Sequence, residues 1–378
     1  MKTLFDLTYV NPASFSGIAV YALRLLRGID QLNSGLSPVL LVTQKNCDYF
    51  ADKFPSFSAI RLQIKEGRIF EKLHAINGYI YKRDLNRIIA DNGIDVLFTP
   101  YLHMGALFST DIPQVGVLHD TQSFDLLKGQ WVKRCVYRVF TQAAIKRMSH
   151  VVVISEHSKI SAVKMVPLLN SMPVTTIYNS VEVSSPLGSS LFSKLSPYIL
   201  VVNTLMPYKN LETLLRAFAI LKSRITHNLV IKAAKLVYWE ATMVPLIEKL
   251  EITDRVYLIP ENFSESRLAS LYSEAAIFVS PSKMEGFGYS PIEAAIHEIP
   301  VVCSKEGALY ETTRGLLNYY SPVDDAEQLA GKIENILLKK TCTEKLRKIS
   351  REYMDVYSPI KQAQELRAVL EKTIKKTS

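Results

Sequence analysis

Residues 275–295 read AAIFVSPSKMEGFGYSPIEAA, and this stretch decides the fold. Its first six residues form an apolar run of the kind found in a strand that is buried on both faces. Two glycines, Gly286 and Gly288, follow in a turn, and a helical pattern begins near Ser290. A buried strand that leads through a glycine turn into a helix is typical of a parallel α/β sheet.

The same alternation of short apolar runs and amphipathic stretches fills the rest of the chain. One such stretch places apolar side chains along a single helical stripe: Leu211, Leu214, Leu215, Phe218 and Leu221. The predicted strands are Thr3–Tyr9, Pro38–Thr43, Asp95–Thr99, Gln114–Leu118, Val151–Ser155, Val174–Tyr178, Tyr198–Asn203, Leu229–Ala233, Val256–Ile259, Ala275–Ser280 and Pro300–Cys303. This order predicts parallel sheets covered by helices.

A small, polar, turn-forming segment at residues 183–190 divides the chain near its middle. Enough strands remain on each side of it for a separate doubly wound sheet. We therefore expect an α/β protein of two Rossmann-like domains that face each other across a cleft. The expected parts are a first domain at residues 1–183, a linker at 184–196, a second domain at 197–357, and a C-terminal helix at 358–378 that packs back on the first domain.

The composition is that of an ordinary globular protein, with 378 residues, 48% of them apolar and 21% charged. It excludes a disordered chain, a fibre and a small disulfide scaffold. The net charge is +9, and residues 1–185 carry 20 basic but only 14 acidic side chains. A nucleic-acid binder usually concentrates its charge more strongly, so we expect no nucleic-acid partner but a phosphorylated ligand or a membrane surface.

Four scattered cysteines, Cys47, Cys135, Cys303 and Cys342, show neither metal-ligand spacing nor a disulfide pattern, which favours a reducing compartment. The N-terminus lacks the pattern of a signal peptide, and no run of about 18 apolar residues occurs. We expect a cytoplasmic protein, with peripheral attachment to the inner membrane face as a further expectation.

The glycine turn allows two interpretations. In the structural one, Ser290 is the N-cap, Pro291 opens the helix, Glu293 completes a capping box, and Glu285 is a solvated loop acid. In the functional one, the helix N-terminus and the glycine backbone hold a pyrophosphate at the carboxyl end of the sheet. The two carboxylates beside it, Glu285 and Glu293, would suit sugar hydroxyls. A pyrophosphate site next to carboxylates that bind hydroxyls indicates a nucleotide-sugar site.

The spacing of Glu285 and Glu293 around Gly-Phe-Gly resembles the signature of the retaining glycosyltransferases of family 4, also called group 1, which have the GT-B fold. Further segments follow the order of that family: Ser16-Gly17-Ile18, His119-Asp120, Ser155-x-x-Ser158, Ile177-Tyr178-Asn179, Pro207-x-Lys209-Asn210, Leu271-Tyr272-x-x-Ala275, Pro300-Val301-Val302 and Ala308-Leu309-Tyr310-Glu311. Many weak motifs in one order favour the functional interpretation.

The resemblance implies a role for each matching residue. Glu285 would contact the transferring sugar, Glu293 the ribose, and Lys209 the diphosphate. His119 would line the acceptor side, and Gly17 would keep room for donor and acceptor to meet. The further donor-binding candidates are Gly286, Phe287, Gly288, Tyr289 and Asn262; Glu285, His119 and Lys209 are the catalytic candidates.

The implied activity is metal-independent, retaining hexosyl transfer from a UDP- or GDP-linked sugar to a glycan or lipid-linked saccharide in cell-surface polysaccharide synthesis. No cofactor is expected beyond the nucleotide sugar itself, and no metal site. Preorganised donors at the pyrophosphate would stabilise the negative charge that grows there as an oxocarbenium-like transition state forms.

Several positions depart from the family pattern. Asn203 and Glu298 stand in place of glycines, as do Ser180 and the pair Ala233-Ala234, and Tyr208 stands in place of an arginine. A tyrosine cannot imitate the forked donors of arginine. These departures keep open an alternative, a non-catalytic GT-B partner that binds a nucleotide sugar or another transferase. A sugar-nucleotide epimerase of similar architecture is a third possibility.

Residues 126–150 contain six basic side chains and no acid, with apolar residues at helical spacing from Trp131 to Ala143. One interpretation is a core helix with a basic solvent face. The other is an interfacial helix that rests on an anionic membrane surface.

Elsewhere, His157 is expected to be structural or solvated, and His103 and Met104 are expected to line a cleft or loop.

Overall fold

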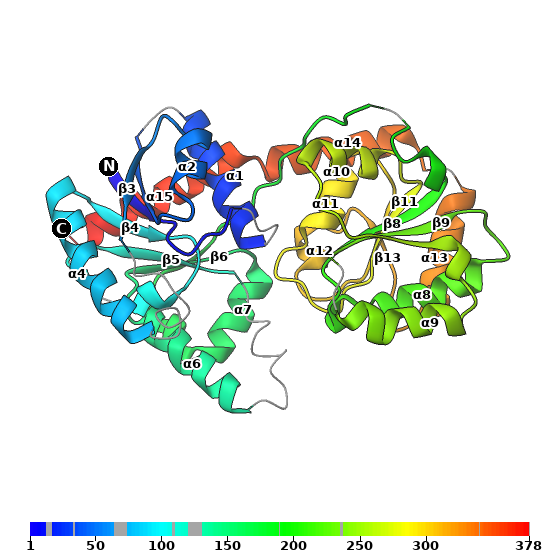
Figure 1. Cartoon of the computed structure of the whole chain (residues 1–378), viewed down its shortest axis with the longest axis horizontal. Coiled ribbons are helices and arrows are strands. Elements are labelled where there is room, and N and C mark those ends of the chain that lie inside the picture. Colours follow the sequence, from blue (N-terminus) through cyan, green and yellow to red (C-terminus); the bar gives the residue numbers. More distant parts are fainter. Residues whose placement is uncertain are drawn as a thin grey trace. The chain divides into compact units, whose positions relative to one another are not determined.

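The computed structural model describes residues 1–12, 17–32, 35–63, 74–107, 110–119, 131–188, 190–234, 237–339 and 341–377. The chain divides into two compact units (Figure 1). Unit 1 comprises Met1–Ser180 and Tyr357–Ser378, and unit 2 comprises Val181–Val356. Each unit contains a parallel sheet with covering helices, which confirms the predicted fold class.

In the described part of unit 1, seven parallel strands form one sheet in the order β3-β2-β1-β4-β5-β6-β7. The strands are β1 (Lys2–Asp6), β2 (Ser37–Val42), β3 (Ser58–Arg61), β4 (Val96–Thr99), β5 (Gln114–Leu118), β6 (His150–Val153) and β7 (Val174–Thr176). The helices are α1 (Gly17–Leu32), α2 (Cys47–Lys53), α4 (His74–Asn92), α6 (Trp131–Ile145), α7 (Glu156–Met165) and α15 (Pro359–Thr377). The central strands are buried along their whole length, as unbroken apolar runs predict.

In the described part of unit 2, six parallel strands run in the order β10-β9-β8-β11-β12-β13. They are β8 (Tyr198–Val202), β9 (Asn228–Lys232), β10 (Val256–Ile259), β11 (Ile277–Ser280), β12 (Val301–Cys303) and β13 (Asn318–Tyr319). The helices are α8 (Leu211–Leu221), α9 (Val244–Lys249), α10 (Glu265–Ser273), α11 (Tyr289–Ile296), α12 (Leu309–Thr312), α13 (Ala326–Leu338) and α14 (Thr343–Val356). The predicted apolar stripe of α8 is buried in the core of this unit, which confirms that helix.

Short 3-10 turns and one π-helical turn complete the two units. They span Met104–Leu107, Pro167–Ser171, Ser193–Leu195, Pro207–Lys209, Thr253–Arg255 and, for the π-helical turn, Trp239–Met243. Of these, Pro207–Lys209 follows β8 directly and contributes to the candidate active site.

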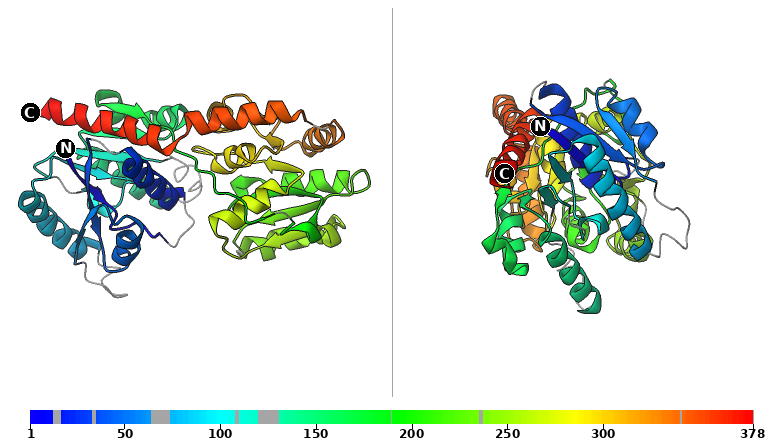
Figure 2. Two further views of the ribbon diagram at one scale, coloured as in Figure 1. Left: turned by 90° about the horizontal axis from the view of Figure 1, so that it is seen from above. Right: turned by 90° about the vertical axis from the view of Figure 1, so that its left-hand side faces the viewer.

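The C-terminal helix α15 packs along α1, as Figures 1 and 2 show. A side chain at Gly28 on α1 would lie 2.1 Å from the carbonyl oxygen of Pro359, so only glycine permits this approach. The Ser180 hydroxyl also donates to Gln362 Oε1 at 2.7 Å. The segment that begins at Tyr357 is therefore an integral part of unit 1.

The expected linker at residues 184–196 is not a free connector. The backbone amides of Leu191 and Phe192 both donate to the carboxylate of Glu274 at 2.9 Å. The Phe192 ring stacks on Phe263, with ring centroids 5.8 Å apart. This segment therefore belongs to unit 2, because its backbone donors and its aromatic ring find partners there.

Candidate active site

The centre of the unit 2 sheet is a topological switch point. Strands β8 and β11 are neighbours, but the chain leaves β8 toward β9 and leaves β11 toward β12. Parallel sheets bind ligands beyond the carboxyl ends of strands at such a point. Two segments that the sequence analysis selected lie there: the turn Pro207–Lys209 after β8 and the glycine loop after β11.

The turn after β8 is held by Asn210, which adopts the left-handed backbone conformation with φ of 56°. Its side-chain amide donates to the carbonyl of Val323 at 2.9 Å, and its Oδ1 accepts from the Thr213 hydroxyl at 2.9 Å. These contacts fix the residue that precedes Asn210, which is Lys209. Lys209 Nζ lies 2.7 Å from Glu285 Oε1. The structure thus brings two of the predicted catalytic residues into direct contact.

The Lys209–Glu285 pair is partly buried, with side-chain exposures of 14% and 13%. At this burial an ion pair is screened less than at the surface, and removal of one partner leaves an uncompensated charge. The carboxylate and the ammonium therefore hold each other at the switch point, where a ligand with both hydroxyl and phosphate groups could engage them.

Gly307 fixes the backbone of Glu285. A side chain at Gly307 would lie 2.6 Å from both the backbone nitrogen and oxygen of Glu285, and its φ of +60° also favours glycine. The neighbouring amide of Ala308 donates to the Glu285 carbonyl at 2.9 Å. The sequence analysis missed this residue, although Gly307 directly precedes the family segment that begins at Ala308.

The capping box predicted for Ser290 and Glu293 is wrong. Helix α11 begins at Tyr289, and its N-cap is Gly288 in the left-handed conformation with φ of 86°. The chain enters the helix earlier than predicted because Gly288 can adopt this conformation, which places Ser290 inside the helix. A glycine N-cap has no side chain, so no N-cap oxygen occupies the helix N-terminus.

Glu293 instead accepts a hydrogen bond from the hydroxyl of Tyr272 at 3.1 Å. Tyr272 is buried and stacks against His297, with ring centroids 5.5 Å apart. Burial lowers the pKa of His297. Tyr272 therefore orients the carboxylate that was predicted to bind ribose, a role that the sequence analysis did not assign although it quoted this tyrosine in a motif.

The remaining donor-binding candidates of the glycine loop are also near these groups. Gly286, Phe287 and Gly288 are buried, and the carbonyl of Phe287 accepts from the Thr312 hydroxyl at 2.6 Å. The Phe287 and Tyr289 rings meet edge to face, with centroids 5.2 Å apart. These contacts fix the backbone that leads from Glu285 into α11.

Two departures from the family pattern lie in the same region. The Tyr208 ring centroid is 5.2 Å from Lys209 Nζ, so the cation packs on an aromatic face where the family has a second cation. The Tyr208 carbonyl also accepts from the amide of Lys283 at 2.8 Å. At the end of β8, both amide atoms of the Asn203 side chain are buried without a hydrogen-bond partner among the described residues.

In unit 1, His119 follows β5, and its Nε2 lies 2.7 Å from the carbonyl oxygen of Pro100. A carbonyl can only accept, so Nε2 carries the proton and Nδ1 holds a lone pair. Burial lowers the pKa of His119 to about 4, so the ring is neutral at neutral pH. The Tyr21 ring supports it edge-on at 4.7 Å between centroids.

Other positions that the sequence analysis selected have simpler outcomes. Gly17 is the first residue of α1 and is exposed. Asn262 is exposed between β10 and α10, and β10 is the edge strand, two strands away from β8; its role in donor binding stays a prediction. Ser16 and Asp120, which completed two motifs, lie outside the described residues.

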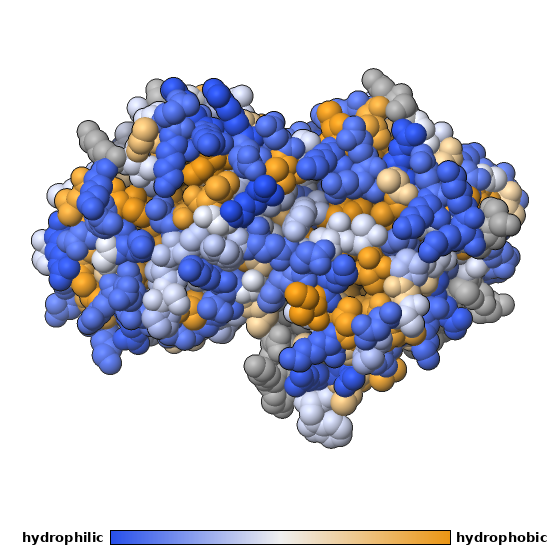
Figure 3. Space-filling model, turned by 180° about the vertical axis from the view of Figure 1, so that it is seen from behind, coloured by the Kyte–Doolittle hydropathy of each residue, from blue (hydrophilic) through white to orange (hydrophobic). Residues whose placement is uncertain are grey.

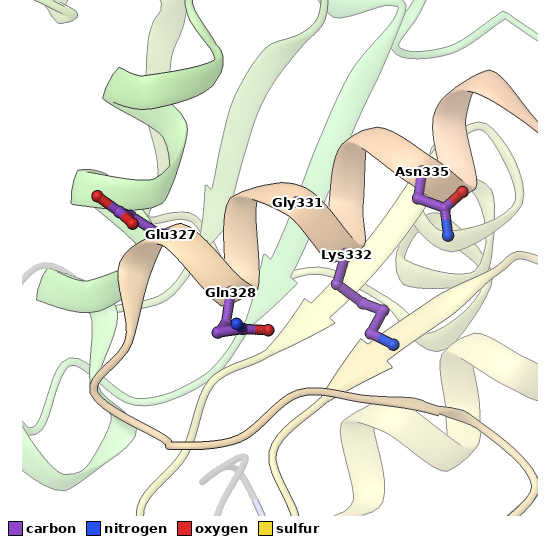
Figure 4. Close-up of a pocket in the computed structure, with 5 residues that line it drawn as sticks. All are labelled: Glu327, Gln328, Gly331, Lys332 and Asn335. Carbon is purple, nitrogen blue, oxygen red and sulfur yellow. The ribbon is translucent and has the colours of Figure 1, made fainter.

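A shallow pocket elsewhere in unit 2 is lined only by residues of α13. Figure 4 shows them along one helix: Glu327, Gln328, Gly331, Lys332 and Asn335. Nothing lies within 4 Å of a side chain built at Gly331, so this is an open helix face. It contains no predicted site residue and brings no paired catalytic groups together.

Within the described ranges, no three His, Cys, Asp or Glu side chains are grouped so that they could hold a metal ion. Likewise, none of the described helices combines the length and the apolar character needed to cross a bilayer.

Two family models match the chain. One, described as Glycosyltransferase Family 4, matches residues 15–185, and the other, described as Glycosyl transferases group 1, matches residues 188–353. The chain therefore belongs to the group 1 glycosyltransferases of the GT-B fold, which confirms the resemblance found in the sequence.

Among curated proteins, the chain is similar to the O-antigen chain mannosyltransferase RfbU of Salmonella typhimurium, with 29% identity over 225 residues. The match covers 59% of this chain and 60% of RfbU, so it spans less than two thirds of that relative.

Two solved structures share the fold over almost the whole chain. One is a sucrose-phosphate synthase from Thermosynechococcus elongatus, with a TM-score of 0.77, 18% identity and full coverage of both chains. The other is HepE from Anabaena in complex with UDP and glucose, with a TM-score of 0.70, 16% identity, and coverage of 98% of this chain and 100% of HepE.

Proposed function

We propose that this protein is a metal-independent, retaining glycosyltransferase that moves a hexose from a UDP- or GDP-linked donor to a glycan or lipid-linked saccharide. The observation that carries the proposal is the Lys209–Glu285 pair, held at 2.7 Å at the switch point of the unit 2 sheet. The similarity to RfbU, an O-antigen chain mannosyltransferase, supports a saccharide acceptor and a place in cell-surface polysaccharide synthesis.

Each group of the site has a task in this chemistry. As the glycosidic bond breaks, positive charge develops on the sugar and negative charge on the diphosphate. In this proposal Glu285 stabilises the positive charge on the sugar and Lys209 the negative charge on the diphosphate. Glu293, oriented by Tyr272, accepts hydrogen bonds from the ribose hydroxyls. In unit 1, the neutral His119 ring offers its Nδ1 to a sugar hydroxyl.

The test is turnover of a donor panel by the full chain. UDP- and GDP-linked glucose, galactose and mannose are incubated with the protein, and the sugar released into water is followed by proton NMR. We expect one donor to be hydrolysed and its first product to keep the anomeric configuration of the donor. An inverted product would overturn the retaining mechanism.

The same experiment separates the alternatives. Nucleotide binding without turnover of any donor would favour the alternative of a non-catalytic partner protein. That alternative is based on Tyr208, which stands where the family has an arginine. Release of an epimerised sugar would favour an epimerase, an interpretation that the two family models leave without support.

A surface of unit 1 supports acceptors carried by lipid. Trp131, Val132, Val136 and Val139 of α6 have exposed fractions of 74%, 54%, 63% and 64%. They lie on one side of the helix at positions i, i+1, i+5 and i+8, and we call them the α6 face. Figures 1 and 2 show this end of α6 pointing away from the sheet of unit 1. The expectation of a core helix is therefore wrong for these turns, and only the last turns are buried.

The α6 face has the chemistry of a membrane-binding surface. On the view in Figure 3, hydrophobic residues are scattered among hydrophilic ones, which is ordinary for a protein surface. Four large apolar side chains together on one helix are less ordinary and indicate an interaction site. Exposed Lys133, Arg134 and Arg138 flank the face, and residues 131–150 contain no acid. We therefore propose that anionic lipid is the partner of the α6 face.

We expect the chain to co-sediment with vesicles that contain anionic phosphatidylglycerol but not with pure phosphatidylcholine. Changing Lys133, Arg134 and Arg138 to Glu should lower the partition coefficient at least tenfold, since each basic residue contributes about 1 kcal/mol near anionic lipid. Added salt should weaken the binding of the unmodified chain.

The control reverses three exposed basic residues elsewhere in unit 1, Lys53, Arg87 and Lys164. This variant has the same net charge as the α6 variant. Equal loss in both variants would show that only net charge matters, and unchanged sedimentation of the α6 variant would leave a soluble glycan as the better acceptor.

A further inference from the structure

The unit 1 sheet has its own topological switch point, between β1 and β4. The carboxyl end of β1 carries Asp6, whose side chain is fully buried. Its Oδ1 accepts from the amide and the hydroxyl of Thr8, at 3.1 and 2.6 Å. Its Oδ2 accepts from the Tyr81 hydroxyl and lies 3.0 Å from Nε2 of His103. A buried carboxylate with so many partners at a switch point marks a candidate binding region.

Besides Tyr81, three aromatic rings lie near this carboxylate. The His103 ring packs against Tyr9 with centroids 4.6 Å apart, and against Tyr101 with centroids 5.3 Å apart. His103 is 6% exposed, whereas Tyr9 is 40% exposed and Tyr101 is half-buried. The two tyrosines therefore present ring surface outward, and His103, fixed by Asp6, supports them from behind.

The loop that carries Tyr9 is held rigidly. The buried side-chain amide of Asn46 donates to the carbonyls of Leu7 and Val10, each at 2.9 Å, on either side of Tyr9. The Tyr101 hydroxyl donates to the carbonyl of Tyr9 itself at 2.8 Å. An exposed aromatic ring on a loop fixed at three points is preorganised for contact with a ligand, because little rotational freedom is left to lose.

The electrostatics favour a neutral ligand. Burial raises the pKa of Tyr9 and of Tyr101, and the Asp6 carboxylate raises both further. Both side chains therefore remain neutral phenols across the physiological range. The two phenols therefore add no charge to this surface. A sugar ring combines an apolar C–H face for an aromatic ring with hydroxyls for nearby acceptors.

We propose that Tyr9 and Tyr101, supported by His103, form a platform that binds a neutral sugar ring of the acceptor. This inference rests on the proposed function, since it assigns the acceptor half of that reaction to unit 1. The platform also continues to His119, because Pro100, whose carbonyl binds His119, directly precedes Tyr101. His103 and Asp6 act as positioning residues beneath the platform.

The test measures glycoside binding directly. The full chain is saturated with UDP or GDP, and saturation-transfer NMR is recorded with the methyl glycosides of glucose, galactose, mannose and N-acetylglucosamine. We expect at least one to bind through its ring C–H groups. Tyr9→Ala should weaken that binding at least about tenfold, and Tyr9→Phe should retain it, because the ring makes the contact.

The matched control is Tyr49→Ala, which removes another exposed tyrosine of unit 1 that is 38% exposed and lies on α2. It should leave glycoside binding unchanged. Unaltered binding in Tyr9→Ala, or no glycoside binding by a chain that binds nucleotide, would overturn the platform. Calorimetry with UDP and GDP on the same samples distinguishes the two proposals. A chain that neither binds nor turns over a nucleotide sugar would contradict the proposed function, whereas only the glycoside-binding results bear on the platform.

Discussion

Turnover of the donor should fall about 10²–10³-fold when Glu285 is replaced by alanine, which is the usual effect of removing one group that stabilises developing charge. The protein should remain folded, because Glu285 is held mainly through its backbone, by Gly307 and Ala308. Because the Glu285 side chain also accepts from Lys209, Glu285→Gln is a useful companion variant. It keeps the shape of the side chain and one acceptor oxygen for Lys209, and it removes the negative charge.

The measurement is the rate of donor hydrolysis, with thermal unfolding recorded on the same samples. Glu352→Ala is a matched control, because it breaks a surface ion pair of unit 2 with Arg314 that lies outside the site. Its turnover should be unchanged. Normal turnover in folded Glu285→Ala would contradict the assignment of Glu285 as a catalytic residue.

Lys209→Ala should weaken the binding of UDP or GDP by about 1.5–3 kcal/mol, which is roughly 10- to 150-fold. Two effects add in this direction. The variant loses the charge-assisted hydrogen bond to the diphosphate, and it leaves the Glu285 carboxylate uncompensated beside an anionic ligand. Because Tyr208 replaces the second cation of the family pattern, Lys209 has no arginine beside it in this turn to share the task.

Isothermal calorimetry with both nucleotides measures this effect, and a double variant separates its two parts. Adding Glu285→Gln to Lys209→Ala should restore part of the affinity, because it removes the repulsion without returning the cation. Lys222→Ala, which removes a half-buried lysine paired with Glu251, should bind nucleotide normally. If Lys209→Ala binds the better nucleotide as tightly as the unmodified chain, the diphosphate site lies elsewhere.

The fold was largely predictable because its central strands are buried on both faces and appear as unbroken apolar runs. Of the edge strands in the described part of the chain, β7 and β10 were predicted, whereas β3 and β13 were not. β3 (Ser58–Arg61) is mostly exposed and contains two polar residues, and β13 (Asn318–Tyr319) has only two residues, so neither produces an apolar run. The predicted division into domains rests on local turn composition, whereas the attachment of residues 184–196 to unit 2 depends on Glu274, which is distant in the sequence.

Glu285, Glu293 and Lys209 could be selected from the sequence because each lies in a short local motif, and their roles stay predictions. The supporting residues could not be selected in this way, because their roles depend on contacts between distant parts of the chain. Gly307 matters only because the Glu285 backbone passes close to it. Asp6 and His103 are 97 positions apart in the numbering and meet only when β1 and β4 pair. The helix start at Gly288 was missed because a backbone conformation, and not a capping side chain, determines it.

The packing of α15 on α1 has a consequence for how the protein is made. Unit 1 is discontinuous, since its last segment begins at Tyr357, whereas unit 2 is one continuous stretch. During synthesis a ribosome therefore completes unit 2 while α1 still lacks its neighbour. Unit 1 can therefore be completed only after its last segment has been made, although most of it is made first. Until α15 has been made, the α1 surface around Gly28 that receives it remains uncovered.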